Sequence, residues 1–218
     1  MSIIVVPTHS QRSLIWSRTQ PPPILDAFNR ADEPILGNGT WTTPSQSGTN
    51  QINLTANQIS SSLGASDAYW SLASFSTTPG VEAYMDFVTV NGTDRFLLQH
   101  CLQNPNSGAE NFYDLQINRA TNLWRLNRID AAVSILLHDH TQAIANGDGG
   151  GIRNIQGLIE VWWRTAGVWS LLFTFTDTTY TSGFIGVGMI GTVNRADNFG
   201  GGIFIPPDPS PFACGTGV

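Results

Sequence analysis

Glu82, Tyr84 and Asp86 alternate along one strand-like stretch of the chain, GVEAYMDFVTV. Every second residue of an extended strand points to the same side, so these three side chains share one face. Two carboxylates on a common face are the groups that glycoside hydrolases use as acid and as base or nucleophile. An aromatic ring between polar groups can instead hold a ligand. The stretch is therefore a candidate for catalysis or for binding.

A second alternating triplet, Glu160, Trp162 and Arg164, lies in the stretch GLIEVWWRT. An aromatic ring on a sheet face can stack on a sugar, and charged neighbours can then donate or accept hydrogen bonds. The candidate stacking residues are Tyr84, Phe112 and Trp162. The alternative, which we expect, is that this face packs against an arm, a loop or a neighbouring subunit, because both faces of the strand around Trp162 are apolar.

Two short segments could bind a metal ion. His138 and His140 lie on one side of an extended segment, about 6–7 Å apart at Cα, but no third ligand is evident and we expect a strand-end turn. The loop 146–151, NGDGGG, offers carbonyl and carboxylate oxygens to Ca²⁺. It has fewer carboxylates than an EF-hand loop, so we expect a hairpin loop there. We expect no metal or other cofactor, with Ca²⁺ as the alternative.

The two cysteines lie far apart, and we expect them to be unlinked. Cys101 is in a strand-like run, RFLLQHCLQ, and Cys214 is in a Pro/Gly-rich tail. A disulfide that tethers the tail would need an oxidising compartment. His100 directly precedes Cys101, so on a regular strand the two side chains face opposite ways. We therefore expect no Cys/His nucleophile pair.

The charge composition excludes several classes of partner. The 218 residues carry a net charge of −6, and all ten basic residues are arginine. Binding to nucleic acid needs clustered Lys or Arg, and no such cluster is present, while the acidic balance also disfavours an anionic membrane. The apolar run at the N-terminus, Ile3 to Val6, ends at Pro7 and is too short for a signal peptide. No run has the roughly 18 apolar residues of a transmembrane helix.

Period-2 alternation of apolar and polar residues dominates the chain, and no segment shows a sustained helical period. Residues predicted to share a face are Val81, Ala83, Met85 and Phe87; Tyr113, Leu115 and Ile117; Trp124 and Leu126; Ile159, Val161 and Trp163; and Trp169, Leu171, Phe173 and Phe175. Further strands are predicted over 24–29, 51–55, 68–75, 95–102, 131–137 and 184–190. About a dozen short strands separated by turn signals predict an all-β fold, a two-sheet antiparallel β-sandwich.

The chain divides into three zones. Residues 1–23 form a Pro-rich N-terminal arm, residues 24–205 the β-sandwich domain, and residues 206–218 a Pro/Gly-rich C-terminal arm. Pro-rich segments are stiff and extended, and an apolar extended segment can add to the edge of a sheet. The arm residues that we expect to make assembly contacts are Ile3, Ile4, Val5, Val6, Pro21, Pro22, Pro23, Pro206, Pro207 and Phe212.

Several segments of the domain together resemble a known family. These are Asp26–Asp32 (DAFNRAD) followed by Leu36 and Trp41, the run YDLQINR from Tyr113, the stretch GLIEVWWRTAGVWSLL, and the closing ADNF that ends at Phe199. Together they resemble the concanavalin A-like (laminin-G-like) lectin and glucanase domains over roughly residues 24–205. The resemblance implies a jelly roll whose first and last strands are neighbours in one sheet.

Glucanases of this family carry a strand motif Glu-x-Asp-x-Glu. In this chain Tyr84 stands at the position of the central acid, and Asp86 at that of the last. The helper carboxylate is therefore missing and the last acid is shorter by a methylene group. We expect no enzymatic activity, and we expect the face of Glu82, Tyr84 and Asp86 to be a solvated polar strand face.

The same fold serves lectins, enzymes and viral structural proteins. We expect a virion-associated structural protein, a bacteriophage capsid decoration protein or a tail or fibre component, made in the host cytoplasm. The reason is a lectin-like sandwich that lacks a secretion signal and is flanked by two Pro-rich arms. Its partners would be other virion subunits or copies of itself, contacted through the arms and a sheet face. The alternative is an extracellular carbohydrate-binding module or adhesin for surface glycans, and a third hypothesis is a glycan hydrolase.

Overall fold

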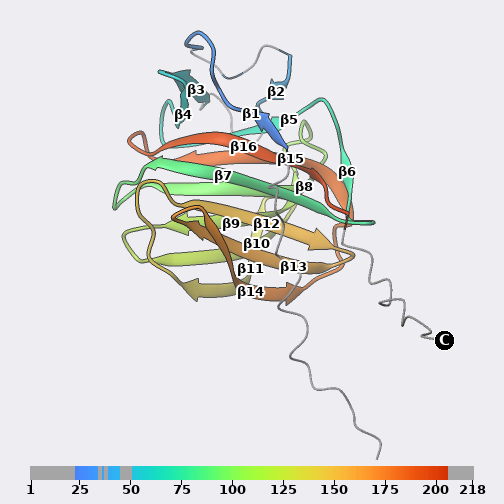
Figure 1. The fold of residues 1–218 in the computed structure, drawn as a ribbon. Coiled ribbons are helices and arrows are strands. Elements are labelled where there is room, and N and C mark those ends of the chain that lie inside the picture. Colours follow the sequence, from blue (N-terminus) through green and yellow to red (C-terminus); the bar gives the residue numbers. More distant parts are fainter. Residues whose placement is uncertain (1–22, 34–35, 37–38, 45–50, 206–218) are drawn as a thin grey trace, which may run out of the picture.

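The computed structural model describes residues 23–33, 36, 39–44 and 51–205. Within these ranges the chain forms sixteen β-strands and no helix, so no helical segment there is able to cross a membrane. The strands form two antiparallel sheets that stack on each other (Figure 1). The predicted all-β, two-sheet antiparallel sandwich is confirmed, with more strands than the dozen expected.

The first sheet, which we call the β7 sheet, has eight strands. Its order is β14 (Val168–Thr176), β13 (Leu158–Thr165), β12 (Gly149–Ile155), β7 (Val81–Thr89), β16 (Arg195–Ile203), β4 (Gln58–Ser61) and β3 (Ile52–Thr55), and β1 (Ile24–Asp26) also pairs with β16. The pairing joins Ile24 to Gly200 and Asp26 to Phe199. The first and last strands are thus neighbours, as the family resemblance implies.

The second sheet, the β8 sheet, also has eight strands. Its order is β11 (Val133–Thr141), β10 (Leu123–Asp130), β9 (Asn111–Asn118), β8 (Arg95–Gln103), β15 (Ser182–Ile190), β5 (Ala65–Trp70) and β2 (Trp41–Thr42), and β6 (Phe75–Ser76) also pairs with β15. Each sheet therefore has one face toward the other sheet and one outer face.

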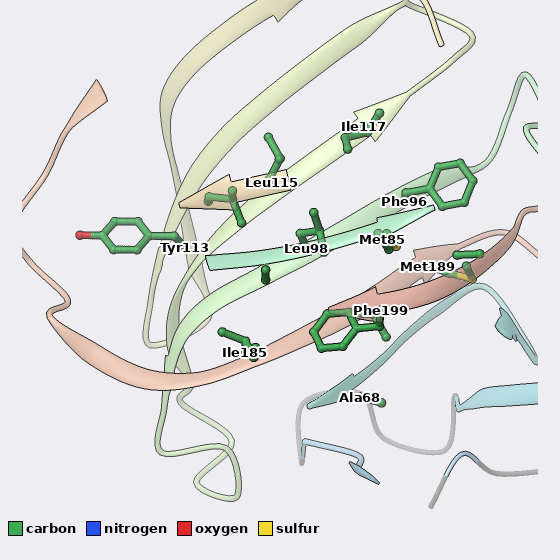
Figure 2. Packing of buried hydrophobic residues seen from close by; sticks show 14 of the residues in the cluster. Ala68, Met85, Phe96, Leu98, Tyr113, Leu115, Ile117, Ile185, Met189 and Phe199 are labelled. Atoms are coloured by element: carbon green, nitrogen blue, oxygen red, sulfur yellow. The ribbon is translucent and has the colours of Figure 1, made fainter. Parts of the chain in front are cut away.

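The hydrophobic core lies between the two sheets (Figure 2). The sets predicted to share faces on β7, β9, β10 and β13 all point into it. Phe87 of β7 stacks on Phe96 of β8, with ring centroids 4.4 Å apart. Burial of a large apolar side chain stabilises a fold by about 1.5–3 kcal/mol, so this layer explains why the sandwich forms.

The prediction for β14 is wrong, because residues 169–175 do not all share one face. The ladder between β13 and β14 shifts register at Leu172, which is an extra residue on β14. Phe173 consequently turns into the core, whereas Leu171 stays on the outer face and is 45% exposed. A β-bulge of this kind re-aims side chains. It also leaves Trp169 on the outer face.

The expectation that His100 and Cys101 cannot meet is also wrong. Cys101 has a φ of 56° at an irregularity of the β8 ladder, and its Sγ lies 3.2 Å from His100 Nδ1. Burial raises the pKa of the thiol to about 12 and lowers the pKa of His100 to about 4. Both groups are therefore uncharged at neutral pH, and this pair is a buried structural contact, because a reactive cysteine needs a thiolate. Cys214 lies outside the described residues.

A row of polar side chains crosses the outer face of the β8 sheet. Gln99 of β8, Asp114 of β9 and Asn127 of β10 are side by side in the ladder and are at most 3% exposed. Burial is the largest influence on Asp114 and raises its pKa to about 7, with Asp67 acting in the same direction and the Gln116 amide, Arg95 and Asn127 opposing. Near neutral pH the protein therefore holds a buried carboxyl that is only partly ionised.

We expect Asp114→Asn to stabilise the protein at pH 8. The native carboxyl has a pKa above its unfolded value, so the native state binds the extra proton and stability falls as pH rises from 4 through 7. Removal of the charge should raise the free energy of unfolding at pH 8 by up to about 4 kcal/mol, since each tenfold change in proton affinity is worth about 1.4 kcal/mol. The gain should vanish toward pH 4. Urea unfolding of both proteins at each pH measures it.

Asp139→Asn is the control, and we expect it to change stability in the opposite direction, as a loss above about pH 4. The Arg125 guanidinium lowers the pKa of Asp139, so the wild-type carboxylate contributes stability above about pH 4 that is lost on acidification. A gain for Asp114→Asn that is independent of pH would contradict a raised pKa for Asp114.

Candidate functional site

The register of β7, β12 and β13 brings both predicted triplets onto one outer face. β12 lies between the other two strands and contributes a residue to every row. The three rows are Glu82–Arg153–Glu160, Tyr84–Gly151–Trp162 and Asp86–Gly149–Arg164. Six residues chosen from two separate stretches of sequence therefore form one surface.

The first row is a buried ion-pair network centred on Arg153. Its Nη2 donates to Glu82 Oε2 at 2.9 Å, and its Nη1 to Glu160 Oε2 at 3.4 Å. The Trp162 indole N–H donates to the same Glu160 oxygen at 3.2 Å. The Phe204 ring lies over the guanidinium, 3.6 Å from its central carbon, and Arg153 is only 1% exposed.

The expectation of a solvated polar face on β7 is therefore wrong. Glu82 is 3% exposed and Tyr84 is 5% exposed. Arg153 supplies the opposite charge that a buried carboxylate requires, and Phe204 covers this end of the face. Burial, followed by the charges of Asp86 and Glu82, raises the pKa of Tyr84 to about 12, so its hydroxyl stays protonated.

The second row consists of two aromatic side chains with a glycine between them. Tyr84 and Trp162 flank Gly151, and Trp169 from β14 meets Tyr84 edge to face at 6.0 Å. A Cβ on Gly151 would touch both Tyr84 and Trp169 at 3.4 Å. These residues line a pocket of about 10 Å³, which is room for one water. A larger ligand must therefore lie across the mouth of the pocket.

The third row is half-exposed. Arg164 Nη2 lies 2.6 Å from Asp86 Oδ1, and the two side chains are 22% and 19% exposed. The guanidinium of Arg164 lies over the Trp169 ring at 5.6 Å. Asn198 of β16 donates from Nδ2 to Asp86 Oδ2 at 3.1 Å. This end of the face combines an aromatic ring with paired charges and an amide.

Asn198 occupies a strained backbone position beside this row. Its φ is 50°, in the left-handed region, at a register shift between β16 and β7. Its own N–H bonds Asp197 Oδ1 at 2.7 Å. Burial, together with Asp86 and Asp26, raises the pKa of Asp197. Bulges with such conformations often re-aim side chains at functional sites.

The remaining candidates lie elsewhere. Phe112 is on the outer face of the β8 sheet and is 4% exposed in an apolar cluster with Tyr69, Leu102, Ile129 and Phe184. It therefore cannot join Tyr84 and Trp162.

His138 and His140 do share a side, but they lie within β11, not at a strand-end turn. Both rings pack near Phe173, at 4.3 and 5.6 Å. Of the loop 146–151, residues 149–151 belong to β12, and Asp148 accepts hydrogen bonds from the Ala145 backbone and the Trp163 indole. In the described part of the chain no three His, Cys, Asp or Glu side chains are grouped to hold a metal.

Arg153, Trp169 and Asn198 complete the face and were not predicted. Arg153 follows the glycine run GGGI, and only its placement opposite Glu82 and Glu160 reveals its role. Trp169 was predicted to share a face with Phe173 and Phe175, because the bulge between them carries no clear sequence signal. Asn198 lies in the ADNF segment, which contributed to the family resemblance but contained no candidate site residue.

No family model matches this chain, and no curated protein matches it by sequence.

Solved structures share its architecture. Carbohydrate binding module CBM66 from Bacillus subtilis is 15% identical, with a TM-score of 0.59 over 75% of this chain and 96% of that one. The VIP36 exoplasmic/lumenal domain in its Ca²⁺/Man2-bound form is 10% identical, with a TM-score of 0.59 over 78% and 84%. A native glycosidic hydrolase is 10% identical, with a TM-score of 0.58 over 85% and 97%. At these identities the likeness shows the fold, a jelly roll of the galectin-like and concanavalin A-like type.

We expect Arg153→Met to destabilise the protein by about 3–5 kcal/mol, because it leaves the Glu82 carboxylate buried without its cation. The second change Glu82→Leu should restore much of that loss. Chemical unfolding of the single and double variants measures both effects. Arg125→Met is a matched control at an exposed pair with Asp139 and should cost less than about 1 kcal/mol. Equal losses for the two single variants would show that Arg153 has no special role.

Proposed function

We propose that this protein binds glycans through the outer face of the β7 sheet, at the end formed by Asp86, Arg164 and Trp169. The observation that carries the proposal is the row arrangement. An aromatic row lies directly beside a half-exposed row of paired charges. A sugar has apolar C–H faces and a rim of hydroxyls, so it needs both kinds of surface at once.

The charges on this face suit neutral hydroxyl groups. Arg164 and Asp86 already pair with each other, and Asn198 bonds Asp86. A fixed carboxylate, guanidinium and amide can each accept from or donate to a hydroxyl without a net charge being neutralised. Structures with the same fold support this proposal, since they include a carbohydrate binding module and a domain bound to Man2.

Binding without hydrolysis fits the geometry better than catalysis does. Glu82 and Asp86 are four residues apart on β7, which is about 13 Å along a strand. Glycosidases hold their two carboxyls about 5–5.5 Å apart when they retain configuration and about 6.5–9.5 Å apart when they invert it. Glu82 is in addition bound to Arg153 and covered from solvent.

We expect Trp169→Ala to weaken glycan binding at least tenfold in calorimetric titrations with the best ligand from a glycan array. The loss of the ring removes the stacking surface and the support for Arg164. Val168→Ala, the exposed neighbour on the same strand, should bind like the wild type. If both Trp169→Ala and Trp162→Ala bind as tightly as the wild type, this face is not the glycan site.

We further expect the protein to release no reducing sugar from polysaccharides over long incubations. Glucans, fructans and mannans are suitable substrates for this assay. Cleavage that Glu82→Gln abolishes, in a variant that remains folded, would establish a glycosidase instead.

The virion-associated role stays a prediction, as do the virion location, the extracellular alternative and the assembly of copies of the chain. Its arm residues lie outside the described residues, apart from Pro23, whose carbonyl accepts a hydrogen bond from the Gly201 N–H at 3.3 Å. A glycan-binding face and docking arms can act in one particle protein, so the proposal made here does not compete with that role.

A further inference from the structure

A second polar pocket lies on the outer face of the β8 sheet, on the opposite side of the sandwich from the face described above. Three adjacent strands and one turn form it. Its lining residues are Arg95, Gln116, Asn118, Thr121, Leu123 and Arg125. The cavity holds about 160 Å³, which is room for several water-sized groups, since by this measure one water needs about 10–15 Å³.

The two guanidinium groups of this pocket retain unused donors. Arg95 donates from Nη1 to Gln116 Oε1 at 3.3 Å and forms no ion pair with a described carboxylate. Arg125 uses Nε and Nη2 in a two-pronged pair with Asp139 at 2.9 and 3.0 Å. Its Nη1 has no partner in the described part of the chain. The pocket therefore presents guanidinium N–H groups that no described carboxylate occupies.

Buried groups behind the pocket orient Arg95. Gln116 Nε2 donates to Asp114 Oδ2 at 2.7 Å, which leaves Gln116 Oε1 directed to Arg95. Asp114 is 3% exposed, and its pKa of about 7 means that below neutral pH it is mostly uncharged. It then holds the Gln116 amide without neutralising the arginine. Asp114 and Gln116 act here as positioning residues.

A carboxylate is the group that this arrangement fits. Guanidinium groups bind planar carboxylates through two parallel hydrogen bonds. The pocket is larger than one carboxylate, and the rest of its lining combines two amides, a hydroxyl and the apolar side chain of Leu123. Those groups suit a ring that bears hydroxyls. We propose that the pocket is a second binding site, for a carboxylate carried on a hydroxylated ring, which is the chemistry of a uronic acid residue in an acidic saccharide.

This second site is independent of the glycan-binding face proposed above. The two sites lie on different sheets and share no residue. They also differ in the donors that they offer, because the charges around Trp169 are already paired, whereas Arg95 has no ion-pair partner among the described residues and Arg125 has an unused N–H group. A neutral saccharide and an acidic one should therefore bind separately.

The test is calorimetric titration with a galacturonate trimer, a neutral galactose trimer and acetate at pH 6 and low salt. We expect the acidic trimer to bind, and Arg95→Gln to weaken it at least tenfold. Asp139→Asn should tighten binding severalfold, because the Arg125 Nε and Nη2 donors that bond the Asp139 carboxylate become available to the ligand. A gain of affinity cannot result from damage to the fold. Thermal unfolding of each variant confirms that it is folded.

Arg195→Gln is the matched control, since it removes the same charge from β16 of the other sheet at a residue that belongs to neither proposed site, and it should leave the affinity for the acidic trimer unchanged. If Arg164→Gln abolishes that binding and Arg95→Gln does not, the anion binds the opposite face and the proposal is wrong. Equal binding of acetate and the acidic trimer would overturn the saccharide assignment. If Arg95→Gln weakened the binding of the neutral trimer as much as that of the acidic trimer, the role of the carboxylate would be overturned.

Discussion

The glycan-binding face proposed for the β7 sheet depends on the buried guanidinium of Arg153. Burial of a charge is unfavourable unless opposite charges and hydrogen bonds compensate it. Glu82 from one neighbouring strand and Glu160 from the other provide that compensation. A shift of one residue in either ladder would turn the partner glutamate to the other side of the sheet. Arg153 therefore fixes the register of three strands, and the aromatic and half-exposed rows follow from that register.

Glycines make the same arrangement sterically feasible. β12 carries Gly149, Gly150 and Gly151 in succession. On the core side, a Cβ at Gly150 would lie 2.8 Å from both Ile117 and Phe87, so large core side chains fill the space that this strand leaves. On the outer side, the absence of side chains at 149 and 151 gives the neighbouring strands room for their rings. The glycines of β12 thus leave room for neighbouring side chains on both sides of the strand, in the core and on the outer face.

Sequence alternation was sufficient for the fold class and for most core-facing residues, because the period of a strand is a local property. It also identified six of the residues on the outer face of the β7 sheet. It could not show that two triplets 78 residues apart lie side by side, because strand pairing is non-local. The ladder irregularities near Cys101, Leu172 and Asn198 each add or re-aim a residue. They therefore break the strict alternation on which the predicted faces depend. Burial of Glu82 was missed for the same reason, since its partner Arg153 is remote in sequence.

The residues that carry the family resemblance explain why it indicates fold better than function. Asp26 bonds the indole of Trp41 at 2.8 Å, and Phe199 packs on the same ring at 5.1 Å. Phe28 joins them in the core. These contacts tie the first strand to the last and say nothing of the outer faces. Function in a sandwich of this kind belongs to the outward rows. In this chain those rows differ between the sheets: aromatic rings with paired charges on one, and arginines with spare donors on the other. A single fold can therefore present two chemically distinct surfaces, and the residues on each outer face, not the fold that they share with other jelly rolls, decide what each surface can bind.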